Sequence, residues 1–209
     1  MITLLLAAAA AAPLTWEARA ELDNVAIAEN RQTLAGGTSL TSLGLAGGVD
    51  LGKYVGVDLG WHYGRRESFV GVAMPEVPGA GFETRFGAQR IELGARAQVP
   101  VLDLFIPYVG ARGALALVRH TIDQDLDQIG NTIEEHRSAV APGLELVAGF
   151  GVGTPVRDKD DPYGSEPRVG LMLRFELGWS TYARFDLAGL GDARLGGATG
   201  TVAIGARYR

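Results

Sequence analysis

The 209-residue sequence contains no cysteine, and after its first twenty residues it has no apolar run of about 18 residues, the length that a membrane-spanning helix needs. The missing cysteine excludes a disulfide framework, a thiolate metal site and a lipid anchor on an N-terminal cysteine. Basic residues do not outnumber acidic ones. The net charge is −5, which argues against nucleic acid as a partner because such proteins present a basic face.

No phosphate-binding loop, zinc motif or sequence repeat of about 20–50 residues is evident, so no cofactor is expected. Glycine, in contrast, occupies 30 of 209 positions, about twice its usual share of roughly 7%. Glycine weakens strands, so this excess indicates tight turns or a crowded interior. The length suits a single domain.

The N-terminus predicts an exported protein. Residues Leu4–Ala12 form an apolar run that is long enough for a signal peptide and too short to span a bilayer, although no Lys or Arg precedes it. The tripeptide Ala18-Arg19-Ala20 has the small-x-small form of a cleavage site. We therefore predict a signal peptide over residues 1–20 and a mature domain over residues 21–209; the alternative is an N-terminal core helix.

The segment Arg168–Thr181, RVGLMLRFELGWST, has the clearest pattern in the chain. Every second residue from Val169 to Trp179 is apolar, and the positions between them carry charge or are small. A strand places alternate side chains on opposite faces, so one face would be apolar and the other polar. Such a strand fits either a half-buried soluble sheet or the wall of a membrane β-barrel.

The same alternation recurs between segments rich in Gly, Pro or charge. It predicts strands over residues 22–30, 38–52, 54–65, 82–99, 105–120, 141–154, 168–181 and 199–209. In the fourth strand the apolar residues change from even-numbered to odd-numbered positions near Gln89-Arg90. This reversal of the apolar parity predicts a β-bulge. The predicted connections are residues 67–81, 121–137, 155–166 and 182–197. The fold class is therefore all-β: an eight-stranded antiparallel up-and-down transmembrane β-barrel with both termini on one side.

The alternate positions that carry polar residues, called the polar parity, help to decide between two barrels. One is a membrane barrel, and the other is a soluble barrel whose apolar residues face inward. Glycine and alanine fill the polar parity between the charges, as a narrow eight-stranded lumen requires. Aromatic residues bracket the strands, as in membrane girdles. The chain also has an export signal, and its last strand runs to the C-terminus. These features favour the membrane barrel, in which lipid offers no hydrogen bonds and the last strand must pair with the first.

On this strand pattern, which covers residues 22–209, the chain resembles the small outer-membrane β-barrels of Gram-negative bacteria, of the OmpA transmembrane-domain and OmpX type. The resemblance implies an outer-membrane location, contact with outer-membrane lipid and lipopolysaccharide, and a monomer. In such proteins the barrel-assembly machinery reads an aromatic residue at the end of the last strand. Here Tyr208 is penultimate and Arg209 is last.

The polar parity predicts a lumen-facing charged network. Buried charges must be paired or hydrated, so we interpret this set first as a lumen plug and second as a selectivity element or proton-linked gate. Because arginine outnumbers the carboxylates in the set, any leak is predicted to favour anions. The set consists of Asp58, His62, Arg90, Glu92, Arg96, Arg112, Glu145, Arg168, Arg174, Glu176 and Arg207.

Aromatic residues at the strand ends predict two girdles: Trp61, Tyr63, Phe86 and Trp179 at the outer rim, and Phe105, Phe150 and Tyr208 at the inner rim. Two further patterns are weaker. The carboxylates Asp123, Asp125, Asp127 and Glu134 fall at positions 1, 3, 5 and 12 of a calcium-loop template, but Gln128 replaces its glycine; a solvated acidic loop, or divalent bridging to lipopolysaccharide phosphates, are the alternatives. His62, His120 and Ser180 could form a hydrolase site, without the spacing of a known motif.

These observations predict a non-enzymatic outer-membrane barrel with a plugged or very narrow charged lumen and a structural, adhesive or protective surface role. The alternative is a porin-like small-solute channel that weakly favours anions. A membrane lipid hydrolase and a soluble exported barrel are less favoured. The sequence indicates no particular ligand, because loop residues would provide its binding site.

Overall fold

The computed structural model describes residues 14–29, 39–71, 81–101, 104–126, 131–154, 169–186 and 192–208. Within these ranges no helix is long and apolar enough to cross a bilayer. The regular elements are strands: β1 (Thr15–Glu29), β2 (Ser39–Asp50), β3 (Val55–Gly71), β4 (Gly81–Gln98), β5 (Phe105–Leu126), β6 (Asn131–Gly153), β7 (Val169–Tyr182), β8 (Phe185–Asp186) and β9 (Asp192–Tyr208).

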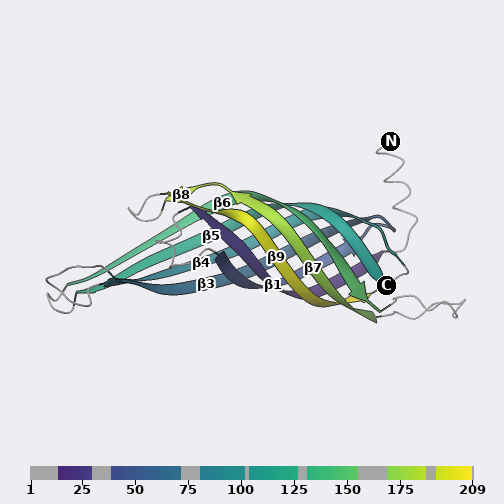
Figure 1. Ribbon diagram of the computed structural model, residues 1–209, viewed down its shortest axis with the longest axis horizontal. Helices are drawn as coiled ribbons and strands as arrows, with labels where there is room; N and C mark the ends of the chain where they lie inside the picture. The colour runs from purple at the N-terminus through teal and green to yellow at the C-terminus, as the bar shows by residue number, and fades with distance from the viewer. Residues whose placement is uncertain are drawn as a thin grey trace, which may run out of the picture.

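Eight long antiparallel strands close into a barrel (Figure 1). Each strand from β1 to β7 pairs with the next, β7 pairs with β9, and β9 pairs back with β1 from Trp16↔Tyr208 to Glu29↔Arg194. The two-residue strand β8 adds only a short pairing to β9. The predicted eight-stranded up-and-down barrel is therefore confirmed, and its closure leaves no long strand with an unpaired edge.

The two ends of the barrel differ. Because Trp16 lies opposite Tyr208, the start of β1 and the end of β9 lie at the same end. At the opposite end the hairpins β3–β4 and β5–β6 project beyond the rest of the barrel (Figure 1), with pairing that continues to Gly71↔Gly81 and Leu126↔Asn131. Bacterial outer-membrane barrels keep short turns on the periplasmic side and longer excursions outside. By that convention the end with the projecting hairpins is called the extracellular end below, and the other the periplasmic end.

Several strands are longer than the sequence pattern indicated. The first begins at Thr15 rather than near residue 22, and much of the predicted loops 67–81 and 121–137 belongs to the projecting hairpins. The two hairpin extensions have polar residues on both faces, so they lack the alternation that identifies a half-buried strand, and cross-strand pairing holds them instead. The predicted turn over residues 155–166 and Arg168 lie outside the described residues.

The predicted β-bulge near Gln89-Arg90 is wrong. β4 pairs without interruption from Gly81↔Gly71 to Ala97↔Val55 on one side and with β5 on the other. The apolar parity reverses because the surroundings of the interior-facing side chains change: they are charged along the middle of β4 and apolar near its extracellular end. Phe86 consequently points into the barrel and is fully buried, so its assignment to the outer girdle is wrong as well.

The outer wall is apolar along the strands. Leu43, Leu177 and Trp179 are 69%, 74% and 65% exposed, and large apolar residues on the other long strands are exposed in the same way. A water-soluble protein rarely exposes an apolar surface of this extent. The wall therefore faces lipid, and the polar side chains at the alternate positions point into the interior.

Candidate functional site

The barrel interior is the site that the fold builds, and it holds charge at high density. Eight carboxylates, five arginines and two histidines are buried there among the described residues. They are Glu17, Glu21, Asp23, Asp50, Asp58, Glu92, Glu145, Glu176, Arg19, Arg90, Arg96, Arg112, Arg174, His62 and His120.

Asp58 is the centre of the network toward the periplasmic end. Its Oδ1 accepts a hydrogen bond from Nη1 of Arg19 at 2.9 Å and another from Nη1 of Arg96, and Nη1 of Arg174 lies 3.5 Å away. Glu17 connects the same arginines, because it pairs with Arg19 at 2.9 Å and with Arg174 at 3.0 Å. Shared partners of this kind compensate buried charges that would be costly alone.

Asp50 closes the network near the periplasmic rim. Its two oxygens lie 2.5 Å from Nη2 of Arg96 and 2.5 Å from Nη2 of Arg207. Arg207 is half-buried and stands on β9 next to the end of the last strand. Its ion pair thus connects β9 to the β2–β3 turn region across the interior.

A second group of ion pairs crosses the middle of the barrel around Glu176. Nη2 of Arg112 lies 2.6 Å from both oxygens of Glu176, and the hydroxyl of Tyr108 donates to the same carboxylate at 2.7 Å. Arg112 also lies 3.6 Å from Glu145. The guanidinium of Arg174 covers the Tyr108 ring at 4.7 Å from its centroid, which connects this group to Asp58.

His62 lies between two carboxylates on opposite sides of its ring. Nε2 is 2.7 Å from Glu21, and Nδ1 is 3.5 Å from Glu92. Arg90 pairs with Glu92 at 3.3 Å and with Asp23. These contacts connect β1, β3 and β4, so the network is continuous around the barrel rather than a set of isolated pairs.

Inward-facing glycines provide the space for these large side chains. A Cβ at Gly44 would lie 2.1 Å from Cδ2 of His62, and a Cβ at Gly94 would lie 2.5 Å from Cγ of Arg112 and from the Ala111 carbonyl oxygen. Much of the glycine excess is thus explained by a narrow lumen in which small and large residues oppose each other.

Replacing Gly94 by Ala is expected to destabilise the barrel by about 1–3 kcal/mol, because the added methyl overpacks against Arg112 and the backbone. The matched control is Gly113→Ala, whose Cβ would face outward with its nearest neighbour at 3.9 Å. Urea-dependent unfolding in lipid vesicles measures both. Equal stability of the two variants would contradict the packing argument.

The extracellular end of the interior is apolar. Phe86 and Phe185 stack with ring centroids 6.3 Å apart, and Val25, Ile27, Leu40 and Leu195 are buried in the same cluster. Because Phe185 belongs to β8, the short β8–β9 hairpin contributes a large side chain to the barrel mouth. The sequence did not indicate this cluster, because the alternation assigns apolar residues such as Phe86 to the lipid-facing side of the wall.

The predicted hydrolase residues are not brought together in the described structure. The hydroxyl of Ser180 is buried without a hydrogen-bond partner, as are both ring nitrogens of His120. His62 instead contacts Glu21 and Glu92. A serine nucleophile needs a base within hydrogen-bonding distance, and neither histidine provides one here.

The calcium template does not coincide with a loop. Asp123 and Asp125 stand in β5, where Asp123 pairs across the hairpin with Glu134 of β6. Asp127 lies outside the described residues. A calcium template needs a loop that winds around the ion, whereas the backbone of these residues runs in paired strands. No metal-binding group of three or more suitable side chains occurs in the described part of the chain.

The remaining residues of the predicted girdles face outward. Trp61, Tyr63 and Trp179 are exposed, as is Tyr208. Phe105 and Phe150 form a ladder with Phe175, with centroid distances of 5.4 and 5.3 Å. The sequence reasoning missed Trp16, which lies opposite Tyr208 and within the predicted signal peptide.

The structure places the predicted lumen residues inside the barrel, apart from Arg168, which lies outside the described residues, and the half-buried Arg207. It also adds Glu17, Arg19, Glu21, Asp23 and Asp50, which the sequence reasoning missed. Counting these, carboxylates outnumber arginines, so the premise for an anion-favouring leak is wrong. For the four residues of β1 the alternation of Trp16–Asp23 contains this signal, but the prediction of a signal peptide over residues 1–20 covers most of that segment.

The closed antiparallel wall, the apolar exterior and the paired charges inside define the class: the chain is a small transmembrane β-barrel. No protein-family model matches the sequence, and neither does any curated protein. The fold is similar to solved structures of outer-membrane and surface proteins. For Neisserial surface protein A the TM-score is 0.46 with 16% identity over 93% of this chain and 95% of that chain.

Two further similar structures come from other bacteria. For Ail, the attachment invasion locus protein of Yersinia pestis, the TM-score is 0.44 with 12% identity over 94% of this chain and 98% of that one. For the outer membrane protein OprG of Pseudomonas aeruginosa the TM-score is 0.42 with 14% identity over 93% of each chain.

Proposed function

We propose that this protein is a bacterial outer-membrane barrel with an occluded lumen, and that its role is structural or at the cell surface rather than catalytic. One observation carries the proposal: paired charges fill the interior from Asp50 to Arg90, and the apolar cluster around Phe86 fills it beyond. A chain of water through such an interior would have to displace ion pairs or pass between packed apolar side chains, and both are costly.

The outward apolar wall supports the membrane location, and the N-terminal apolar run supports export. We further propose that the assembly machinery reads Tyr208 near the end of β9, and that the barrel is a monomer because closure through β1 and β9 leaves no long edge to pair. The projecting hairpins are the parts that contact the cell exterior and lipopolysaccharide.

In planar bilayers the protein is expected to give no sustained conductance steps on the nanosiemens scale, because the lumen is occluded. A general porin in the same bilayer is the positive control, and a shift in electrophoretic mobility between unheated and boiled samples shows that the inserted protein is folded. Sustained steps would favour the channel alternative. The excess of carboxylates then predicts cation selectivity in a reversal-potential measurement.

A further inference from the structure

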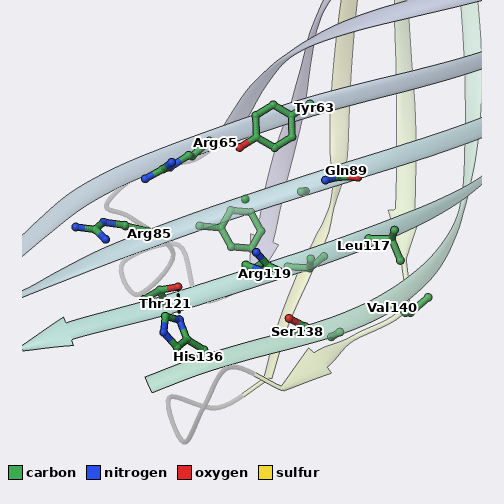
Figure 2. Close-up of a pocket in the computed structure, with 15 residues that line it drawn as sticks. Tyr63, Arg65, Arg85, Gln89, Leu117, Arg119, Thr121, His136, Ser138 and Val140 are labelled. Carbon is green, nitrogen blue, oxygen red and sulfur yellow. Dashed lines mark hydrogen bonds between the residues drawn. The ribbon is translucent and has the colours of Figure 1, made fainter. Parts of the chain in front are cut away.

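The outer wall has a groove at the extracellular boundary of the apolar belt. It has a volume of about 860 Å³ and lies over strands β3–β6, where these continue into the projecting hairpins (Figure 2). Three successive rows of outward residues define it. The row nearest the membrane is Tyr63, Gln89, Leu117 and Val140, which are paired in this order across the four strands.

The next row contains two arginines with a glycine between them. It consists of Arg65, Gly87, Arg119 and Ser138, again paired in this order. Gly87 leaves the surface open between the two arginines: a Cβ there would meet only the Gly64 carbonyl oxygen, at 3.7 Å. Arg65 pairs with Glu67, whereas Arg119 is exposed and makes no ion pair with any described residue.

The third row continues the polar lining with Arg85, Thr121 and His136. The last two share a hydrogen bond of 3.0 Å, and Arg85 pairs with Glu83 at 3.1 Å. Figure 2 shows Arg85, Thr121 and His136 farther along the strands than the row of Tyr63, Gln89, Leu117 and Val140. The groove thus changes from apolar to cationic in the direction that an outer-leaflet lipid changes from acyl chain to head group.

We propose that this groove binds the phosphorylated sugar head group of an outer-leaflet glycolipid, a proposal that rests on the membrane orientation in the proposed function. Arg119 and Arg65 hold the phosphate, since guanidinium groups form charge-assisted, bidentate pairs with phosphate oxygens. Tyr63, Gln89 and Ser138 provide hydrogen-bonding groups for sugar hydroxyls. A simple phospholipid head group would match the arginines and leave these groups unused.

The test is native mass spectrometry of the protein released from nanodiscs of phosphatidylcholine that contain equal minor fractions of lipid A and phosphatidylglycerol. The expected result is preferential retention of lipid A. Arg119→Gln removes the unpaired cation and is expected to lower that retention about tenfold, the equivalent of one charge-assisted contact. Gly87→Leu fills the groove without changing charge and is expected to lower it similarly.

Two matched variants control for charge and size. Arg184→Gln removes an exposed arginine near the extracellular end, between β7 and β8, and Gly113→Leu adds an outward side chain within the apolar belt. Both are expected to retain lipid A as the unmodified protein does. The heat-dependent mobility shift is measured for every variant. A variant that keeps this shift but loses lipid A has lost the groove and not the folded barrel.

Equal retention of lipid A and phosphatidylglycerol would overturn the glycolipid proposal. Retention of lipid A that neither Arg119→Gln nor Gly87→Leu lowers would place binding elsewhere and overturn the groove as its site. In both cases a preserved mobility shift would leave the membrane barrel intact. A wild-type protein without that shift would instead contradict the proposed function.

Discussion

A chain that begins at Glu21 is expected not to form the barrel, whereas a chain that begins at Leu14 is expected to form it. Residues Thr15–Ala20 are the first six of the 15 residues of β1 and pair on both sides, with Asp50–Leu45 of β2 and, from Trp16 onward, with Tyr208–Ile204 of β9. Without them, the periplasmic halves of β2 and β9 would face lipid with unpaired backbone groups, each costing several kcal/mol.

The truncation would also remove Arg19 and Glu17 from the charged network. Asp58 and Glu21 would each lose a guanidinium partner, while Arg174 would lose its 3.0 Å contact with Glu17. Loss of pairing and loss of charge compensation act on the same end of the barrel, so we expect complete loss of folding rather than partial destabilisation.

Refolding of both chains into detergent micelles measures this result, with heat-modifiability and far-ultraviolet circular dichroism as the readouts. The chain from Leu14 is the matched control. A normal mobility shift from the chain that begins at Glu21 would show that Thr15–Ala20 of β1 are dispensable for folding.

The same geometry bears on export. Cleavage after Ala20, which the sequence predicts, would leave a mature protein that lacks the first six of the 15 residues of β1. We therefore propose that processing takes place before Thr15, so that Ala18 and Ala20 remain as outward residues of the wall. The intact mass of the protein purified from membranes decides between the two positions.

The sequence predicted the wall well because lipid and lumen impose opposite demands on alternate residues. Arg174 and Glu176 were expected on one face, and both lie inside the barrel. Their main partners, Glu17 and Arg112, are on distant strands. The alternation identifies an inward residue but does not say which residue lies opposite, because that depends on the register of strands far apart in sequence.

The prediction failed where the surroundings of a strand change along its length. Phe86 belongs to the same inward parity as Arg90 and Glu92, but it lies in the apolar cluster at the extracellular end. A rule that assigns apolar residues to lipid has no means of recognising an apolar interior. The groove was unpredictable for a related reason, since only the register brings Arg65, Gly87 and Arg119 into one row.

Replacing Asp58 by Asn is expected to lower the free energy of unfolding by about 3–5 kcal/mol, the usual cost of removing one partner from a buried ion pair. Asp58 contacts the guanidinium groups of Arg19, Arg96 and Arg174. The amide keeps the size of the side chain and removes only its charge, so the loss measures electrostatics rather than a cavity.

Urea-dependent unfolding in lipid vesicles, followed by tryptophan fluorescence, measures the change. The control is Asp186→Asn, the same chemical change at an exposed position of β8, which is expected to stay within about 0.5 kcal/mol of the unmodified protein. If Asp58→Asn were equally stable, the three arginines would be compensated by Glu17 and Asp50 alone. The excess carboxylates would then leave net negative charge in the lumen. A cation-conducting channel would explain such an interior better than an occluded barrel.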